Sequence, residues 1–144
     1  MIIHTASEGI SFAKKLETKA AGFFEDISQK YPDQAEPIVS LAKENKKFVS
    51  QIERAYYQVI TDAIEGGFAF NIETDDYTFE TSNQEDTSKA DILALIMKME
   101  ETIIKFYTDA AEQSKSLMAD VPRAFMLVVK KRNKRMSKIR AIFE

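Results

Sequence analysis

Two stretches of nine residues carry a shared pattern that decides the fold. Residues 16–24 read LETKAAGFF, and residues 99–107 read MEETIIKFY. In each stretch a glutamate, Glu17 or Glu100, stands six residues before a pair of aromatic residues. The apolar residues recur at intervals of three and four, which is typical of one face of a helix. The repetition predicts that a helical hairpin was duplicated within the chain.

Helical spacing of apolar residues extends on both sides of these stretches and predicts four helices. We expect them at about residues 7–30, 34–65, 87–118 and from residue 120 to the C-terminal end. Ser7 is the expected N-cap of the first helix, and Gly66-Gly67 is the expected end of the second. Only a few residues separate helix one from helix two and helix three from helix four, so each pair is expected to form a hairpin.

Residues 66–90 break the helical spacing and connect the two predicted hairpins. They contain six acidic residues between Glu73 and Asp86, and the first basic residue is Lys89. Alternating aromatic and aliphatic residues predict an extended segment laid on the bundle, whereas the alternative is a disordered linker. A helix of 25 residues spans about 37 Å, and roughly a dozen extended residues cover that distance. The segment can therefore return the chain to the opposite end, which predicts two hairpins joined by a long crossover.

Length and composition limit the class of protein. A chain of 144 residues is expected to form a single all-α domain over residues 1–144. The absence of cysteine excludes disulfides and thiolate chemistry. The side chain of the one histidine, His4, is expected to be disordered near the terminus and not to bind a metal. The net charge of −3 and a pI near 5.3 argue against nucleic acid as a partner. Without an 18-residue apolar stretch or a leader, we expect a soluble cytoplasmic protein with no membrane partner.

Five polar residues interrupt the apolar faces of the predicted helices. Glu17 lies about 60° from Ala20 around its helix, and Glu100 lies about 60° from Ile103. Asn45 on the second helix, and Arg132 and Arg135 on the fourth, lie within about 40° of an apolar residue at the centre of their stripes. A buried charge without a partner is costly, so these side chains are expected to contact one another or a metal.

The repeated spacing Glu-x5-Phe-Phe/Tyr resembles the rubrerythrin branch of the ferritin-like superfamily, and the resemblance covers all four predicted helices. It implies a ferritin-like four-helix bundle built around a di-iron centre. In that family helices one and three each supply a glutamate, and helices two and four each supply Glu-x-x-His. By position, the glutamates of helices one and three are Glu17 and Glu100.

The other four expected ligands are replaced in this chain. The Glu-x-x-His of helix two falls on Asn45 and Phe48, and that of helix four falls on Arg132 and Arg135. An amide is a poor iron ligand, a phenyl ring is none, and a guanidinium repels a cation. We therefore expect no metal cofactor. Bidentate pairs between the arginines and the two glutamates, with Asn45 adding donors and an acceptor, are expected in its place.

Two alternatives stay open at this point. In one, the arginines reach solvent and the two glutamates pair with surface lysines. In the other, Glu17 and Glu100 bind two iron or manganese ions with Glu44 or Glu53, and the protein is a di-iron or di-manganese oxidoreductase. Tyr107, expected near Glu100, is then a radical or proton donor. Without a metal, Tyr107 is expected to be a hydrogen-bonding core residue.

The fourth predicted helix is strongly basic, with seven arginines and lysines between Lys130 and Arg140. We expect a solvated face that pairs with the acidic residues of segment 73–86, rather than a site for RNA, anionic lipid or an acidic protein. Taken together, the residues predict a metal-free interaction or scaffold protein that has an unidentified protein partner and no assigned catalytic residue. The resemblance also implies that two copies can form a homodimer.

Overall fold

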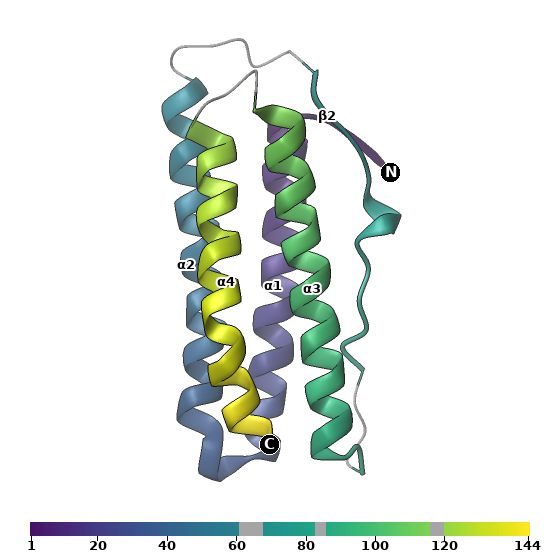
Figure 1. Cartoon of the computed structure of the whole chain (residues 1–144), viewed down its shortest axis with the longest axis vertical. Helices are drawn as coiled ribbons and strands as arrows, with labels where there is room; N and C mark the ends of the chain where they lie inside the picture. Colours follow the sequence, from purple (N-terminus) through teal and green to yellow (C-terminus); the bar gives the residue numbers. More distant parts are fainter. Residues whose placement is uncertain (61–67, 83–85, 116–119) are drawn as a thin grey trace.

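Four long helices run side by side in this chain (Figure 1). The computed structural model describes residues 1–60, 68–82, 86–115 and 120–144. The helices are α1 (Ala6–Lys30), α2 (Ala35–Ile60), α3 (Lys89–Ser114) and α4 (Asp120–Phe143). A short 3-10 turn, Pro32–Gln34, joins α1 to α2. The all-α expectation is therefore confirmed. The predicted helix ends at Gly66-Gly67 and near residue 118 lie outside the described residues.

The starts of the helices agree only partly with the prediction. The N-cap of α1 is Thr5 and not Ser7, which lies inside the helix. The Glu8 N–H donates to Thr5 Oγ1 at 3.1 Å, and the Thr5 N–H donates to Glu8 Oε1 at 3.0 Å. This reciprocal capping box satisfies two backbone donors, so Thr-x-x-Glu is a stronger start signal than an isolated serine. Ser88 is the N-cap of α3 and accepts from the Asp91 N–H at 3.1 Å, which agrees with the predicted start of the third helix near residue 87.

The helices form two hairpins. Helix α1 packs chiefly on α2, and α3 packs chiefly on α4; α2 also packs along α4, whereas α1 and α3 touch each other little. The predicted apolar faces point inward and make up the core. Core residues from all four helices that are at most 1% exposed include Ala20, Phe24, Ile52, Ile103 and Ile139.

The N-terminal residues form a strand that the sequence analysis did not predict. Strand β1 (Ile2–Thr5) pairs antiparallel with β2 (Phe68–Glu73), which begins the described part of the crossover. Ile3 lies opposite Ile72 in this two-stranded sheet. His4 lies in β1, and its backbone N–H donates to Glu8 Oε1 at 3.2 Å.

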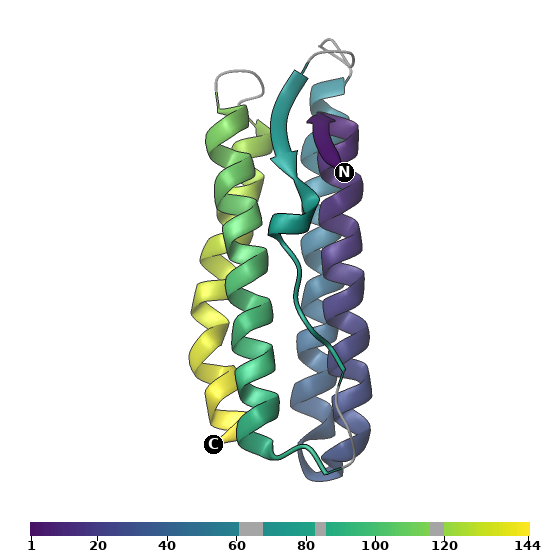
Figure 2. The same ribbon diagram turned by 90° about the vertical axis from the view of Figure 1, so that its right-hand side faces the viewer.

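The crossover runs lengthwise along the side of the bundle between α1 and α3, from the end where β2 lies to the end where α3 begins (Figure 2). Four of its aromatic and aliphatic residues are buried: Phe70, Ile72, Tyr77 and Phe79. These side chains cover the gap that α1 and α3 leave between them. The described residues 68–82 thus form the predicted extended segment, apart from a short 3-10 turn at Thr74–Asp76, and return the chain along the bundle.

Polar contacts hold the crossover to both neighbouring helices. The Tyr77 hydroxyl donates to Asp109 Oδ2 on α3 at 2.5 Å, and the Tyr77 ring meets Phe106 edge-on at 5.5 Å between centroids. Burial, followed by the charge of Asp109, raises the pKa of Tyr77, so the phenol stays protonated. On the other side, Lys19 Nζ of α1 donates to the Phe79 carbonyl oxygen at 2.6 Å.

The described acidic residues of the crossover do not pair with the basic helix α4. Over the described residues, no ion pair joins α4 to segment 73–82. Figure 1 shows the crossover beside α3, whereas α4 lies beside α2 on the other side of the bundle. The expected pairing is therefore wrong for the described acidic residues of segment 73–86, and Glu85 lies outside them.

Candidate functional site

Four buried charges meet midway along the helices. Glu17 comes from α1, Glu100 from α3, and Arg132 and Arg135 from α4, and each is at most 4% exposed. Two negative and two positive side chains make this group neutral, and we call it the ion-pair layer. The alternative in which the arginines reach solvent is therefore wrong, as is the pairing of the two glutamates with surface lysines.

Arg132 bridges the two glutamates. Its Nη2 donates to Glu17 Oε1, and its Nη1 lies 2.8 Å from Glu100 Oε1. The guanidinium therefore lies between carboxylates that belong to different hairpins. Because Arg132 is fully buried, its removal would leave both carboxylates without this cation in a medium that screens charge poorly.

Arg135 forms the bidentate pair that the sequence predicts. Its Nε donates to Glu100 Oε2 at 3.4 Å, and its Nη2 donates to Glu100 Oε1. The remaining nitrogen, Nη1, donates to the Leu41 carbonyl oxygen of α2 at 3.2 Å and lies 3.7 Å from Glu44 Oε1. One arginine thus connects α4 to both α2 and α3.

Phe48 of α2 lies against both guanidinium groups. The Cζ atoms of Arg132 and Arg135 are 5.2 and 5.3 Å from its ring centroid, and the Arg135 Cζ is also 5.5 Å from the ring of Phe24. An aromatic face attracts a cation electrostatically, and the attraction is stronger where water is excluded. The Phe48 ring therefore stabilises both buried cations of the layer.

Tyr107 completes the hydrogen bonding of Glu17. Its hydroxyl donates to Glu17 Oε2 at 2.7 Å, so each oxygen of this carboxylate has a partner. Burial, followed by the charge of Glu17, raises the pKa of Tyr107 well above its ordinary value. The prediction of a hydrogen-bonding core residue is confirmed, although the bonded glutamate is Glu17 rather than Glu100.

Asn45 lies at the layer but does not take the expected part in it. The residue is fully buried, yet its side-chain nitrogen and oxygen have no hydrogen-bond partner among the described residues. The expectation that Asn45 donates to and accepts from the charged side chains is therefore wrong. Its amide is the one side chain near the layer that is left with both a donor and an acceptor unused.

The two glutamates differ in the charge they experience. Burial would raise the pKa of Glu100, but Arg132 and Arg135 together outweigh it and lower that pKa. Burial dominates at Glu17, which pairs with Arg132 alone, and raises its pKa. Burial also opposes the charge on Arg132, but Glu100 and Glu17 outweigh it and raise the pKa of the guanidinium. Glu100 is therefore the more firmly ionised carboxylate.

The donor set of the layer does not fit a divalent metal. The carboxylates that could bind one are bonded to guanidinium groups, which repel a dication. Glu44 faces Arg135, and Glu53 lies away from the layer, 3.8 Å from Lys14 Nζ. No group of three or more histidine, aspartate or glutamate side chains in the described part of the chain could hold a metal ion.

The sequence predicts that six residues meet at this place in the bundle. Five of them contact one another in the structure: Glu17, Phe48, Glu100, Arg132 and Arg135. The sixth, Asn45, is buried but its amide has no hydrogen-bond partner among the described residues. The sequence analysis missed the Leu41 carbonyl oxygen, because a backbone acceptor leaves no trace in residue type. It considered Glu44 only as a metal ligand, whereas the structure places its carboxylate near Arg135. The helical position of Glu44, three residues after Leu41, is a signal that could have shown this contact.

Comparisons of this chain with protein-family models, with curated proteins and with solved structures find no match. None of the described helices is both long enough and apolar enough to cross a lipid bilayer.

Proposed function

We propose that this chain is a ferritin-like protein, similar to the rubrerythrins, in which an ion-pair layer has replaced an ancestral di-iron centre. It acts as a metal-free interaction or scaffold protein. The fold assignment is supported by two helical hairpins, by a lengthwise crossover between them, and by the glutamates that recur at the same place in α1 and α3.

The observation that carries the proposal is the position of Arg132 between Glu17 and Glu100. In a di-iron protein the glutamates of helices one and three face metal ions. Here the Arg132 guanidinium forms an ion pair with both carboxylates, and its Nη1 lies 2.8 Å from Glu100 Oε1. Bringing a dication to this point would place it beside two buried cations, which costs far more than it returns in this poorly screened interior.

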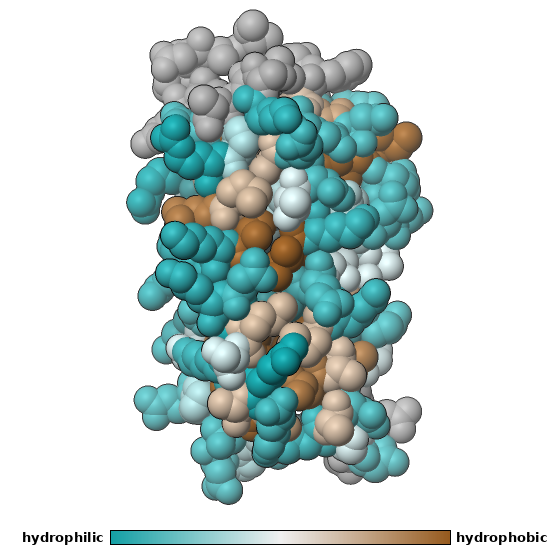
Figure 3. Space-filling model, viewed as in Figure 1, coloured by the Kyte–Doolittle hydropathy of each residue, from teal (hydrophilic) through white to brown (hydrophobic). Residues whose placement is uncertain are grey.

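An interaction role fits the chemistry that remains. The four charged side chains of the layer are buried and pair with one another, so none of them is an unpaired acid or base in contact with bulk solvent. The outer surface is mostly hydrophilic on the face drawn in Figure 3, with apolar residues gathered along its middle. Three large apolar side chains of α2 and α4 stay 45–60% exposed: Tyr57, Met126 and Leu127. Surfaces of this kind are available to a protein partner.

Metal content tests this proposal. We expect protein purified from iron- and manganese-supplemented cultures to contain only trace metal and to lack the absorption of an oxo-bridged iron pair. The matched variant Arg132→Glu/Arg135→His returns Glu-x-x-His to α4 and is expected to bind iron, because it removes two cations and adds two ligands. Two metal ions per wild-type chain would instead support the di-iron or di-manganese oxidoreductase.

A further inference from the structure

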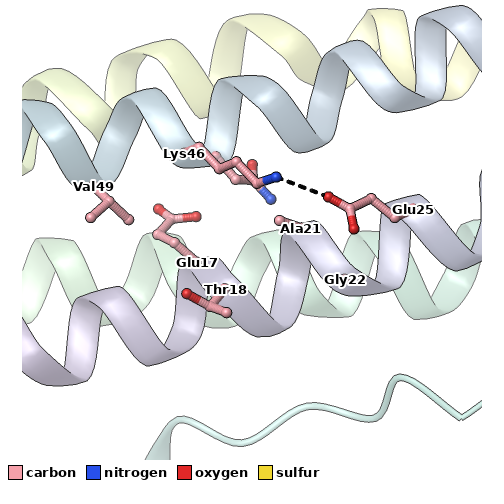
Figure 4. A pocket seen from close by; sticks show the side chains of 8 residues that line it. Glu17, Thr18, Ala21, Gly22, Glu25, Lys46 and Val49 are labelled. Atoms are coloured by element: carbon pink, nitrogen blue, oxygen red, sulfur yellow. Dashed lines mark hydrogen bonds and ion pairs between the residues drawn. The ribbon is translucent and has the colours of Figure 1, made fainter.

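A cavity of about 250 Å³ opens between α1 and α2 and reaches the ion-pair layer. Figure 4 shows Glu17 pointing from α1 into this space, which the ion pair between Lys46 and Glu25 spans. Glu17 and Asn45 form its buried wall, whereas the side chains of Lys46 and Glu25 at its rim are 69% and 48% exposed. An exposed ion pair contributes little free energy, so the rim opens at small cost.

The buried wall carries an amide with no partner. Asn45 contributes to the lining of the cavity, and neither its Nδ2 nor its Oδ1 has a hydrogen-bond partner among the described residues. A buried donor or acceptor left unpaired costs the full desolvation penalty of that group. A molecule that offers an acceptor and a donor side by side would satisfy both atoms at once.

Gly22 keeps this cavity open on the α1 side. A Cβ atom added at Gly22 would have no atom within 4 Å other than those of its two chain neighbours and the backbone of its own helix. The glycine therefore borders empty space, and a larger side chain at this position would fill it. The volume equals that of about eight water molecules at roughly 30 Å³ each, which lies below the range of pockets for drug-sized ligands and suits a small molecule.

We propose that this cavity binds a small neutral molecule with a primary carboxamide or urea group. Its carbonyl oxygen accepts from Asn45 Nδ2, one N–H donates to Asn45 Oδ1, and the second N–H donates to the Glu17 carboxylate. Each Glu17 oxygen has one partner in the structure and keeps a lone pair for this bond. The ligand is neutral because the ion-pair layer is already balanced, and a buried extra charge would have no counter-ion.

This inference goes beyond the proposed function and shares only Glu17 with it. If the cavity binds no amide, the predicted absence of metal is not affected. The metal analysis uses no amide, so its result does not depend on whether the cavity binds one. The two experiments therefore fail separately.

Acetamide is the probe, and acetone and acetate are its matched controls, because the three molecules have the same number of heavy atoms and similar shapes. We expect acetamide, added to ¹⁵N-labelled protein, to shift the Asn45 side-chain NH₂ signals saturably with a millimolar dissociation constant. Acetone lacks the N–H donors and acetate carries a charge that Glu17 repels, so each should bind at least about tenfold more weakly.

Two variants locate the site. Asn45→Leu removes the amide at nearly constant volume and should weaken acetamide binding at least about tenfold. Gly22→Leu fills the cavity, replaces no side chain of the ion-pair layer, and should abolish the binding. The proposal is overturned if acetamide causes no saturable shift, so that the cavity holds water only. It is equally overturned if acetone binds as well as acetamide, or if Gly22→Leu binds as the wild type does.

Discussion

Arg132 is the residue on which the free energy of the ion-pair layer depends most. Its replacement in Arg132→Ala leaves Glu17 without its cation and takes one of two cations from Glu100. We expect the free energy of unfolding to fall by roughly 3–5 kcal/mol, the range for a broken buried ion pair. Urea unfolding followed by circular dichroism measures this change.

Lys134 offers the matched control on the same helix, because it is exposed and takes part in no ion pair described here. Lys134→Ala should change the free energy of unfolding by less than about 0.5 kcal/mol. A loss below about 1 kcal/mol in Arg132→Ala would mean that the guanidinium is not held between the two glutamates.

Glu17 and Glu100 should respond in opposite ways to pH. The folded state raises the pKa of Glu17 above its ordinary 4.5, so the stability that Glu17 contributes is present at low pH and lost as pH rises through the folded pKa. The folded state lowers the pKa of Glu100, so its contribution is present above 4.5 and lost as pH falls through the folded pKa.

The isosteric variants Glu17→Gln and Glu100→Gln separate these two effects. At neutral pH Glu100→Gln should cost roughly 3–5 kcal/mol, because two buried arginines lose their shared partner, and Glu17→Gln should cost less. The amount by which the free energy of unfolding of wild type exceeds that of Glu17→Gln should decrease as pH rises from about 4.5 to 7. Urea unfolding across this range measures both differences. Equal costs and parallel pH profiles would show that the two carboxylates share one environment.

At the level of single residues, the sequence predicts which side chains enter the layer better than it predicts their bonds. Helical spacing turns Glu17 and Arg132 inward, and charge balance then requires that they meet. The free amide of Asn45 could not be predicted, because its hydrogen bonds depend on rotamers and on distances of a few tenths of an ångström. The same holds for Tyr107, whose hydroxyl reaches across to Glu17 on the neighbouring helix.

At the level of elements, α1 provides two glycines with opposite surroundings. A Cβ added at Gly9 would lie 2.7 Å from the ring of Phe70 on β2, whereas one added at Gly22 would meet no atom within 4 Å. Alanine is favoured over glycine in helices by about 1 kcal/mol. Gly22→Ala should therefore raise the free energy of unfolding by about 0.5–1 kcal/mol.

Gly9→Ala should instead destabilise the protein, because overpacking a buried ring costs about 1–3 kcal/mol and outweighs the gain in helix propensity. The double variant Gly9→Ala/Phe70→Leu should recover part of the loss. Thermal unfolding of Gly22→Ala, Gly9→Ala and the double variant, beside wild type, measures the order of their stabilities. A stabilising Gly9→Ala would show that β2 does not lie against α1 in solution.

The helices are predictable from sequence because their apolar spacing and their end signals act locally. The predicted end of the first helix at residue 30 and the predicted start of the third near residue 87 agree with the structure within two residues. Strand β1 is not predictable in this way, because four residues carry little periodic signal and their partner, β2, lies more than sixty residues away. The Thr5-x-x-Glu8 capping box is the local clue that α1 begins directly after this strand.

At the level of the whole molecule, the two hairpins are joined through charge as well as through apolar packing. Glu17 belongs to the first hairpin, whereas Glu100 and both arginines belong to the second, so the Arg132–Glu17 pair crosses the interface between the halves. The hydrogen bond from Arg135 Nη1 to the Leu41 carbonyl oxygen of α2 crosses it as well. The crossover seals the opposite side, between α1 and α3 (Figure 2). The proposed replacement of a di-iron centre rests on this arrangement, in which the Arg132 guanidinium lies between Glu17 and Glu100.

The most direct measurement is a crystal structure of protein grown in iron-rich medium, with diffraction recorded at the iron absorption edge. We predict density for the Arg132 guanidinium between Glu17 and Glu100, and no anomalous peak within the bundle. Two anomalous peaks bridged by these glutamates, with the arginines displaced, would contradict the account.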